Sequence, residues 1–188
     1  MKTFLVATLL LLVLGLPFGA AQEGDDRSGI FVDIGLGVNF SPVDQKAFLT
    51  PLIGLEVSML ERVMVDVGFS FESHSYDFSG IEKTVDRYFT IHLLGKYFLL
   101  GNLWAGTGFA YSMFMNSYTV NAVPATPGAV HPDRIQFLLA AGYLSKVLEG
   151  IYLNPSLLVR MVLPSEEADS FDFNLGLFFT TSLNIRRD

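Results

Sequence analysis

The stretch GIFVDIGLGVNF, residues 29–40, decides the fold class. Apolar side chains occupy every second position from Ile30 to Phe40, and after Phe31 the positions between them are small or polar. A period of two is that of a β-strand, in which successive side chains point to opposite faces. The stretch therefore predicts a strand with one apolar face, which must contact either a protein core or lipid.

Seven further segments repeat this alternation along the chain. Most of them exceed the about five or six residues of a soluble strand and reach the about 9–11 residues that a tilted membrane-spanning strand needs. Strand length therefore favours a membrane barrel. The eight predicted strands are Ile30–Phe40, Leu52–Leu60, Val63–Glu72, Asp86–Phe98, Leu103–Asn116, Arg134–Leu144, Ile151–Leu163 and Phe171–Leu183.

The connections between the predicted strands alternate in length. Three are short: LER at 60–62, LLGN at 99–102 and SKVLEG at 145–150. Residues 41–51, 73–85 and 117–133 form long connections, and the acidic segment 164–170 is intermediate. This alternation is typical of an up-and-down barrel with short periplasmic turns and longer outer loops.

The apolar face of every predicted strand is free of charge. No Asp, Glu, Lys or Arg occupies any of these apolar-face positions. A Lys or Arg on a lipid-facing wall near the bilayer midplane costs about 2–4 kcal/mol, so contact with lipid explains the exclusion. A soluble, lipocalin-like barrel would place this face inside, but the interior of an eight-stranded barrel is too narrow for so many large side chains.

The composition agrees with a spanning barrel. Hydrophobic residues make up 51% of the chain and the mean hydropathy is +0.43, yet after residue 21 no run of about 18 apolar residues predicts a spanning helix. Residues 1–21 resemble a secretory signal peptide with cleavage before Gln22, followed by a polar leader at 22–29, the barrel at 30–184 and a tail at 185–188. The net charge of −7 argues against a nucleic-acid partner, and the lack of cysteine excludes disulfides and thiol chemistry.

The opposite face of the strands carries the charges. Buried charges must be paired or hydrogen-bonded, so we expect a structural ion-pair network inside the barrel, in which Asp33 needs a basic partner. A proton or cation path is the alternative reading. The predicted network comprises six acids and three bases: Asp33, Glu56, Asp66, Glu72, Asp86, Asp172, Lys96, Arg134 and Arg160.

Large side chains also occupy inward positions. Phe31, Phe98, Trp104 and Tyr152 lie near the predicted periplasmic end and are expected to close it. Further apolar residues at inward positions leave a path for small apolar molecules as an alternative; these are Leu94, Phe114, Leu138 and Leu158.

The sequence offers little for catalysis. The one candidate cluster is SHSYD, with Ser73, His74, Ser75 and Asp77, but on a continuing strand His74 points away from both serines. His131 is interpreted as a loop residue. No spacing typical of a metal or cofactor site appears, so no catalytic, metal or cofactor-binding residues are predicted.

Taken together, residues 30–184 resemble the small eight-stranded outer-membrane barrels of the outer membrane protein A, X and W type. In the last strand, Asn174, Gly176 and Phe179 partly match the C-terminal assembly signal of such barrels, although the chain ends in IRRD rather than in an aromatic residue. Pro155 departs from the pattern, because it lies inside the seventh predicted strand and has no N–H to donate; we expect either a bulge there or a different register for this strand.

These observations predict an all-β, eight-stranded antiparallel transmembrane barrel in a bacterial outer membrane. The expected partners are outer-membrane lipid, the barrel-insertion machinery and a surface ligand or host partner bound by the loops. The expected protein is a non-enzymatic monomer with a plugged interior and a structural or surface-interaction role. A narrow transporter for small apolar molecules is the alternative, and a lipid-modifying barrel enzyme is the third.

Overall fold

The structure is a computed structural model that describes residues 29–41, 46–78, 82–120, 133–163 and 173–185. The predicted signal peptide, the leader up to residue 28, His131 and Asp172 lie outside the described residues. Within the described part of the chain, no helix is long and apolar enough to cross a bilayer.

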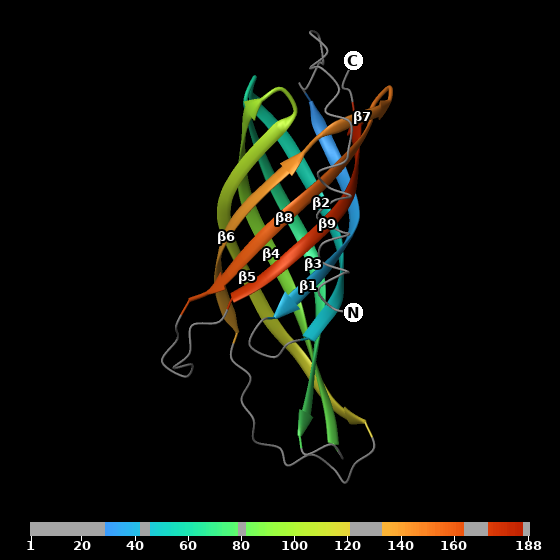
Figure 1. Cartoon of the computed structure of the whole chain (residues 1–188), viewed down its shortest axis with the longest axis vertical. Helices are drawn as coiled ribbons and strands as arrows, with labels where there is room; N and C mark the ends of the chain where they lie inside the picture. The colour runs from blue at the N-terminus through green and yellow to red at the C-terminus, as the bar shows by residue number, and fades with distance from the viewer. Residues whose placement is uncertain (1–28, 42–45, 79–81, 121–132, 164–172, 186–188) are drawn as a thin grey trace, which may run out of the picture.

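The described residues form one closed antiparallel sheet (Figure 1). Each strand pairs with its neighbour in the chain, and pairing of β1 with β9 and of β6 with β8 closes the ring. β6 and β7 are successive pieces of one strand, so the sheet is an eight-stranded barrel, as predicted. The strands are β1 (Ile30–Ser41), β2 (Lys46–Leu60), β3 (Val63–Phe78), β4 (Glu82–Leu100), β5 (Leu103–Val120), β6 (Arg134–Tyr143), β7 (Ser145–Leu148), β8 (Ile151–Val162) and β9 (Phe173–Ile185).

The strands are staggered around the barrel. Following paired residues from Ile30 through each neighbouring strand leads back to β1 at Phe40 rather than at Ile30. Such a stagger requires the strands to tilt against the barrel axis, and in an eight-stranded barrel it leaves an interior that side chains fill.

Four strands are longer than the alternation predicted. β2 begins at Lys46, within the predicted long connection at 41–51. β3 continues to Phe78, β4 begins at Glu82 and β5 continues to Val120, and these three strands extend past the others at the lower end in Figure 1. The predicted long connection at 73–85 is therefore mostly a hairpin. Its sequence is polar on both faces, and a strand without an apolar face gives no alternation to detect.

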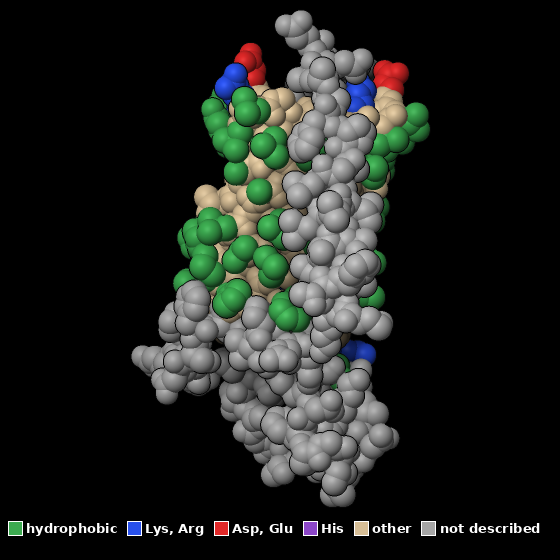
Figure 2. All heavy atoms as spheres, viewed as in Figure 1, with side chains coloured by type: hydrophobic (Ala, Val, Ile, Leu, Met, Phe, Trp, Pro, Cys, Tyr) green, Lys and Arg blue, Asp and Glu red, His purple; other side chains and the backbone are tan. Residues whose placement is uncertain are grey.

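The two faces of the wall separate as predicted. Apolar-face side chains such as Ile34, Phe109 and Phe179 are exposed, whereas the alternate positions are buried inside. Figure 2 shows hydrophobic side chains covering the visible wall, with charged side chains at its upper rim. Because the exposed side of the wall is apolar, it fits a bilayer rather than water.

Pro155 is accommodated by a gap rather than by the expected bulge. Its strand, β8, pairs regularly with β9 through Asn154, Pro155 and Ser156. On the other side, pairing stops between Ser156, opposite Gly142, and Leu153, opposite Ser145. The missing N–H therefore lies where β6 ends and β7 begins, and the seventh predicted strand is confirmed without a change of register. The predicted turn at 145–150 is correspondingly shorter, because Ser145–Leu148 is strand.

The interior next to the short turns is apolar. A turn-end cluster of buried side chains lies there, and most of its members are within a few residues of a turn or of the start of β1. Gly142 leaves room for one of them, since a Cβ on Gly142 would lie 2.5 Å from the Trp104 ring and 2.8 Å from a backbone oxygen of Pro155. The turn-end cluster comprises Phe31, Met64, Phe98, Trp104, Leu144 and Tyr152, and thus contains all four predicted large rings.

Candidate functional site

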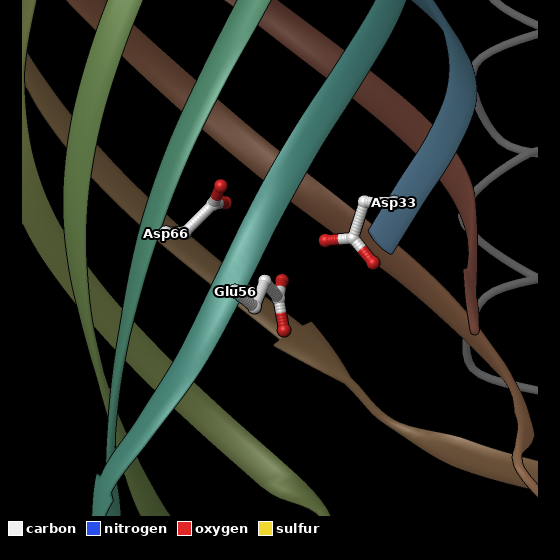
Figure 3. Close-up of side chains that lie close together, drawn as sticks. All are labelled: Asp33, Glu56 and Asp66. Atoms are coloured by element: carbon white, nitrogen blue, oxygen red, sulfur yellow. The ribbon is translucent and has the colours of Figure 1, made fainter. Parts of the chain in front are cut away.

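Three acids from three neighbouring strands meet inside the barrel. Asp33 on β1, Glu56 on β2 and Asp66 on β3 each offer a carboxylate oxygen, and these oxygens lie within 4.8 Å of one another (Figure 3). We call these three residues the acid cluster. Gly54 pairs with Asp33, and a Cβ on Gly54 would lie 3.2 Å from Oδ1 of Asp66 and 3.6 Å from Cβ of Asp33. The missing side chain at Gly54 therefore lets the two aspartates approach each other.

Lys96 on β4 is the cation of this site. Its Nζ contacts Oε1 of Glu56 and lies 2.9 Å from Oδ2 of Asp66. Both ion pairs are almost fully buried, which makes them far stronger and far less screened than surface pairs. The predicted pairing of inward acids with Lys96 is present at Glu56 and Asp66.

A histidine and an aromatic ring complete the site. Nε2 of His92 lies 3.5 Å from Oδ1 of Asp66, in the space that Gly68 leaves opposite it. Nζ of Lys96 lies 4.8 Å from the centre of the Trp104 ring, a cation–π distance. His92 occupies an inward position of the predicted strand 86–98, but nothing in the alternation indicates that it joins the acids.

Asn154 on β8 connects the acid cluster to the turn-end cluster. Its Nδ2 donates to Oε1 of Glu56 at 3.4 Å, and its Oδ1 accepts from Nε1 of Trp104 at 3.0 Å. The backbone oxygen of Asn154 accepts from Thr180 at 3.2 Å. Sequence reasoning missed Asn154, although its inward position next to Pro155 was a signal that could have found it.

Asp33 lacks the basic partner that the sequence led us to expect. Its side chain is 2% exposed, and no Lys or Arg of the described residues forms an ion pair with it. Its Oδ1 has no hydrogen-bond partner in the described part of the chain. Lys96 contacts Glu56 and Asp66 instead, because the described residues place no base on the β1 side of the acid cluster.

A cavity of about 40 Å³ borders the acid cluster. A space of about 10–15 Å³ is enough for one water molecule, so ordered water fits beside these side chains. Polar groups from Asp33, Asp66, His92 and Lys96 line it together with apolar groups from β5, β6 and β8. The arrangement can hold protons and water next to carboxylates.

The remaining predicted charges lie elsewhere in the barrel. Arg160 is 2% exposed, and its Nη1 contacts Oε1 of Glu72, while its guanidinium lies 5.5 Å from the Phe178 ring centre. Asp86 is buried, and Arg134 is half-buried with its guanidinium 4.8 Å from the centre of the Tyr88 ring. The structure therefore separates the predicted network into distinct groups.

Neutral polar side chains also bridge strands across the interior. Nδ2 of Asn39 donates to Thr50 at 2.5 Å. Further along the barrel the hydroxyls of Thr90 and Ser112 are 2.7 Å apart, and Gln136 donates to Ser112 at 3.0 Å. These bonds connect β1 with β2, and β4 with β5 and β6.

Asp133 forms an anchor at the outer end that the sequence did not reveal. Its Oδ2 accepts from the Tyr111 hydroxyl at 2.5 Å, and its Oδ1 accepts from the backbone N–H of Phe114 at 2.9 Å. These bonds, that from Tyr111 first, lower the pKa of the Asp133 carboxyl below its ordinary value because they favour the ionised form. Asp133 thus fixes the start of β6 against β5.

The SHSYD segment lies within a regular strand. β3 keeps its pairing with β4 from Ser73, opposite Arg87, to Asp77, opposite Lys83. The side chains of His74, Ser75 and Asp77 lie outside the described residues, so the expectation for this segment stays a prediction.

Similar solved structures identify the architecture, although neither a protein-family model nor a curated protein sequence matches the chain. The N-terminal β-barrel domain of OprF from Pseudomonas aeruginosa is 11% identical, with a TM-score of 0.52, over 81% of this chain and 97% of that one. Neisserial surface protein A is 8% identical, with a TM-score of 0.52, over 83% and 96%. Ail, the attachment invasion locus protein of Yersinia pestis, in complex with the heparin analogue sucrose octasulfate, is 10% identical, with a TM-score of 0.51, over 82% and 98%.

The chain has the fold of a small outer-membrane β-barrel. The resemblance to barrels of the outer membrane protein A, X and W type is therefore confirmed at the level of architecture. At these identities the likeness concerns the fold alone, so the role of this barrel must be argued from its own residues.

Proposed function

We propose that this protein is an integral, monomeric barrel of a bacterial outer membrane, with a closed interior and a structural or surface-interaction role. The uncharged, exposed wall supports insertion in lipid, and the predicted signal peptide and C-terminal signal support export and delivery to the barrel-insertion machinery. The likeness to outer-membrane barrels supports the same location.

The packing near the turns is the observation that carries the closed interior. The turn-end cluster draws buried side chains from β1, β3, β4, β5 and β8, and the charged acid cluster lies directly beyond it. An ion crossing the barrel would first have to displace packed rings and then separate buried ion pairs. Both steps are costly in an interior of low dielectric constant.

Conductance across a planar bilayer tests the closed interior. The refolded protein should give no steady channel steps above the baseline. A double variant, Phe31→Ala with Trp104→Ala, removes two rings of the turn-end cluster and serves as the opened control, in which steps should appear. Regular conductance steps from the unchanged protein would contradict the proposal.

The protruding part of the sheet supports a role at the surface. β3 pairs with β2 only as far as Ser70, opposite Leu52, and the next residue of β2 is Pro51, which has no N–H to donate. Beyond that point β3 pairs with β4 through Phe78, so in the described residues its other edge has no neighbouring strand from Phe71 onward. An unpaired strand edge is a template on which an extended segment of another protein can add a strand.

A protein is therefore the proposed surface partner. Ail is an attachment protein whose structure holds a heparin analogue, but the net charge of −7 in this chain disfavours a polyanion. An extended, β-prone peptide immobilised on a surface is a suitable probe, because it can add a strand to the free edge of β3. Vesicles carrying the protein should bind this peptide, and vesicles carrying a variant with residues 74–85 replaced by Asn-Gly should not. Equal binding, or no binding, by both would contradict this surface role.

One observation favours the transporter as a second candidate. The gap between β6, β7 and β8 at Pro155 lies beside Asn154 and Ser156, which line the interior cavity. A small apolar molecule entering from lipid at this gap would reach Trp104, the single tryptophan of the chain. Quenching of Trp104 fluorescence by a short brominated alkane, to the extent seen after unfolding, would support the transporter, and protection of Trp104 would oppose it.

A further inference from the structure

The acid cluster is out of charge balance. Asp33, Glu56 and Asp66 bring three carboxyl groups together, while Lys96 brings one permanent cation. His92 is the only other base within ion-pair distance among the described residues, and it adjoins Asp66 rather than Asp33. If all three acids were ionised, the buried site would hold a net negative charge even with His92 protonated.

Asp33 shows where the missing positive charge belongs. Its side chain is 2% exposed, its Oδ1 has no hydrogen-bond partner in the described residues, and it lines the cavity. In Figure 3 the Asp33 carboxylate points toward that of Glu56, which is 1% exposed. Two ionised carboxylates this close in a dry interior repel each other strongly, so one of them must be neutralised.

A metal ion is a poor candidate for this charge. Glu56 and Asp66 each already present one oxygen to the ammonium of Lys96, so a metal held by all three acids would lie close to that ammonium. The metal and the ammonium would then be like charges a few ångströms apart, where repulsion is strong at low dielectric constant. A proton needs no added volume and does not displace Lys96.

We infer that the barrel interior is a proton-binding site, with one proton shared by the carboxyl groups of Asp33 and Glu56. The proton comes from solvent during folding and forms an O–H bond on one carboxyl group, which donates a hydrogen bond to an oxygen of the other. Asp66 stays ionised between Lys96 and His92. Loss of the proton restores two facing carboxylates.

Among the side chains that the structure describes, the other strands offer no group that could replace the proton. From β8 the amide of Asn154 donates to Glu56, and β5, β6 and β9 present Trp104, Leu138 and Thr180 around the same cavity. These side chains do not ionise as acids or bases at neutral pH. The charge of the site is therefore set by the acid cluster, Lys96 and His92 alone.

Infrared spectroscopy of the folded protein in lipid vesicles tests this site. At pH 7 exposed carboxyl groups are ionised, so the C=O stretch of a protonated carboxyl should reveal one buried acid per chain. Asp33→Asn and Glu56→Gln should each abolish that band, because an amide can donate to the remaining carboxylate. Glu72→Gln, in the separate pair with Arg160, is the matched control and should keep the band at full intensity.

Each result of the infrared measurement either supports or contradicts the shared proton. A band in the unchanged protein that both acid-cluster variants lose supports the shared proton. No band at pH 7, a band that appears only after a metal chelator is added, or a band that persists in both variants would overturn it. Should a variant fail to refold, titration of the unchanged protein keeps the test open: the band must disappear reversibly at alkaline pH, and a band unchanged up to unfolding would contradict the site.

Discussion

Nε1 of Trp104 donates a 3.0 Å hydrogen bond to Oδ1 of Asn154, and this bond joins the apolar turn-end cluster to the polar site beyond it. Asn154 in turn donates to Glu56, which contacts Lys96, and Lys96 lies over the Trp104 ring. The four residues come from β2, β4, β5 and β8. A closed loop of contacts therefore ties opposite parts of the wall together through the interior.

The bond between Trp104 and Asn154 should contribute measurably to stability. Trp104→Phe keeps most of the ring but leaves Oδ1 of Asn154 buried without this donor, which costs about 1–3 kcal/mol. We expect the free energy of unfolding in urea, measured in lipid vesicles, to fall by that amount. Tyr97→Phe, at an exposed position of the wall, is the control and should change it by less than about 0.5 kcal/mol. Equal effects of the two variants would show that the bond has no special role.

Loss of Lys96 should make the folded barrel more stable in acid than at neutral pH. Lys96→Met leaves Glu56 and Asp66 without their cation, and breaking a buried pair in this way costs about 3–5 kcal/mol at neutral pH. As the pH falls, the folded barrel takes up protons that the unfolded chain does not yet bind, so its stability should rise. Lys146→Met, on the exposed strand β7, should cost no more than about 1 kcal/mol at any pH. A Lys96→Met barrel with unchanged stability at pH 7 would refute the buried pairing.

Substitution of glycine by alanine should be far more destabilising on the inner face of the barrel than on the outer face. Gly142→Ala places a Cβ 2.8 Å from the Pro155 backbone oxygen and against Trp104, so it should destabilise the barrel by about 1–3 kcal/mol through overpacking. Gly95→Ala is the matched control, because its Cβ would meet only a backbone oxygen of Thr107 at 3.7 Å, on the outer face. Similar unfolding curves for the two variants would argue against the packing described around Trp104.

The anchor at Asp133 should weaken in acid. Its pKa is lowered in the folded state, so the stabilisation is present above the unfolded value of about 3.9 and is lost as the pH falls through the lower, folded value. The amide of Phe114 should then exchange its hydrogen faster once the pH falls below that lowered value. Asp133→Ala, which has no acceptor, should show fast exchange of Phe114 at every pH, while the amide of Phe109, inside the wall, stays protected. An exchange rate of the Phe114 amide that changes with neither the pH nor the substitution would contradict the anchor.

The fold was predictable from the sequence because one physical rule governs the whole wall. Lipid surrounds the wall and the interior is narrow, so apolar and small or polar side chains must alternate with a period of two. The number and order of the strands, and the face that each side chain takes, therefore follow from Ile30–Phe40 and its repeats. The rule fails where lipid ends, and for that reason the alternation did not predict the extensions of β2, β3, β4 and β5. It also says nothing of how Pro155 is accommodated, because that depends on a gap in the neighbouring strand.

The site was predictable only in its parts. The alternation assigns Asp33, Glu56, Asp66 and Lys96 to inward positions, and in the structure all four are buried inside the barrel. Which acid meets which base depends on the stagger between strands and on the room left by Gly54 and Gly68, and neither follows from one strand alone. The expectation of a base beside Asp33 was wrong for this reason, and Asn154 was missed.

The most direct test of the whole account is the migration of the protein on a gel before and after boiling, using isolated outer membranes. A closed barrel held by ladders around its full circumference resists detergent until it is heated. We predict that the protein is found in the outer-membrane fraction and that its boiled and unboiled forms migrate differently. A protein found in the soluble fraction, with boiled and unboiled samples migrating together, would contradict the membrane barrel.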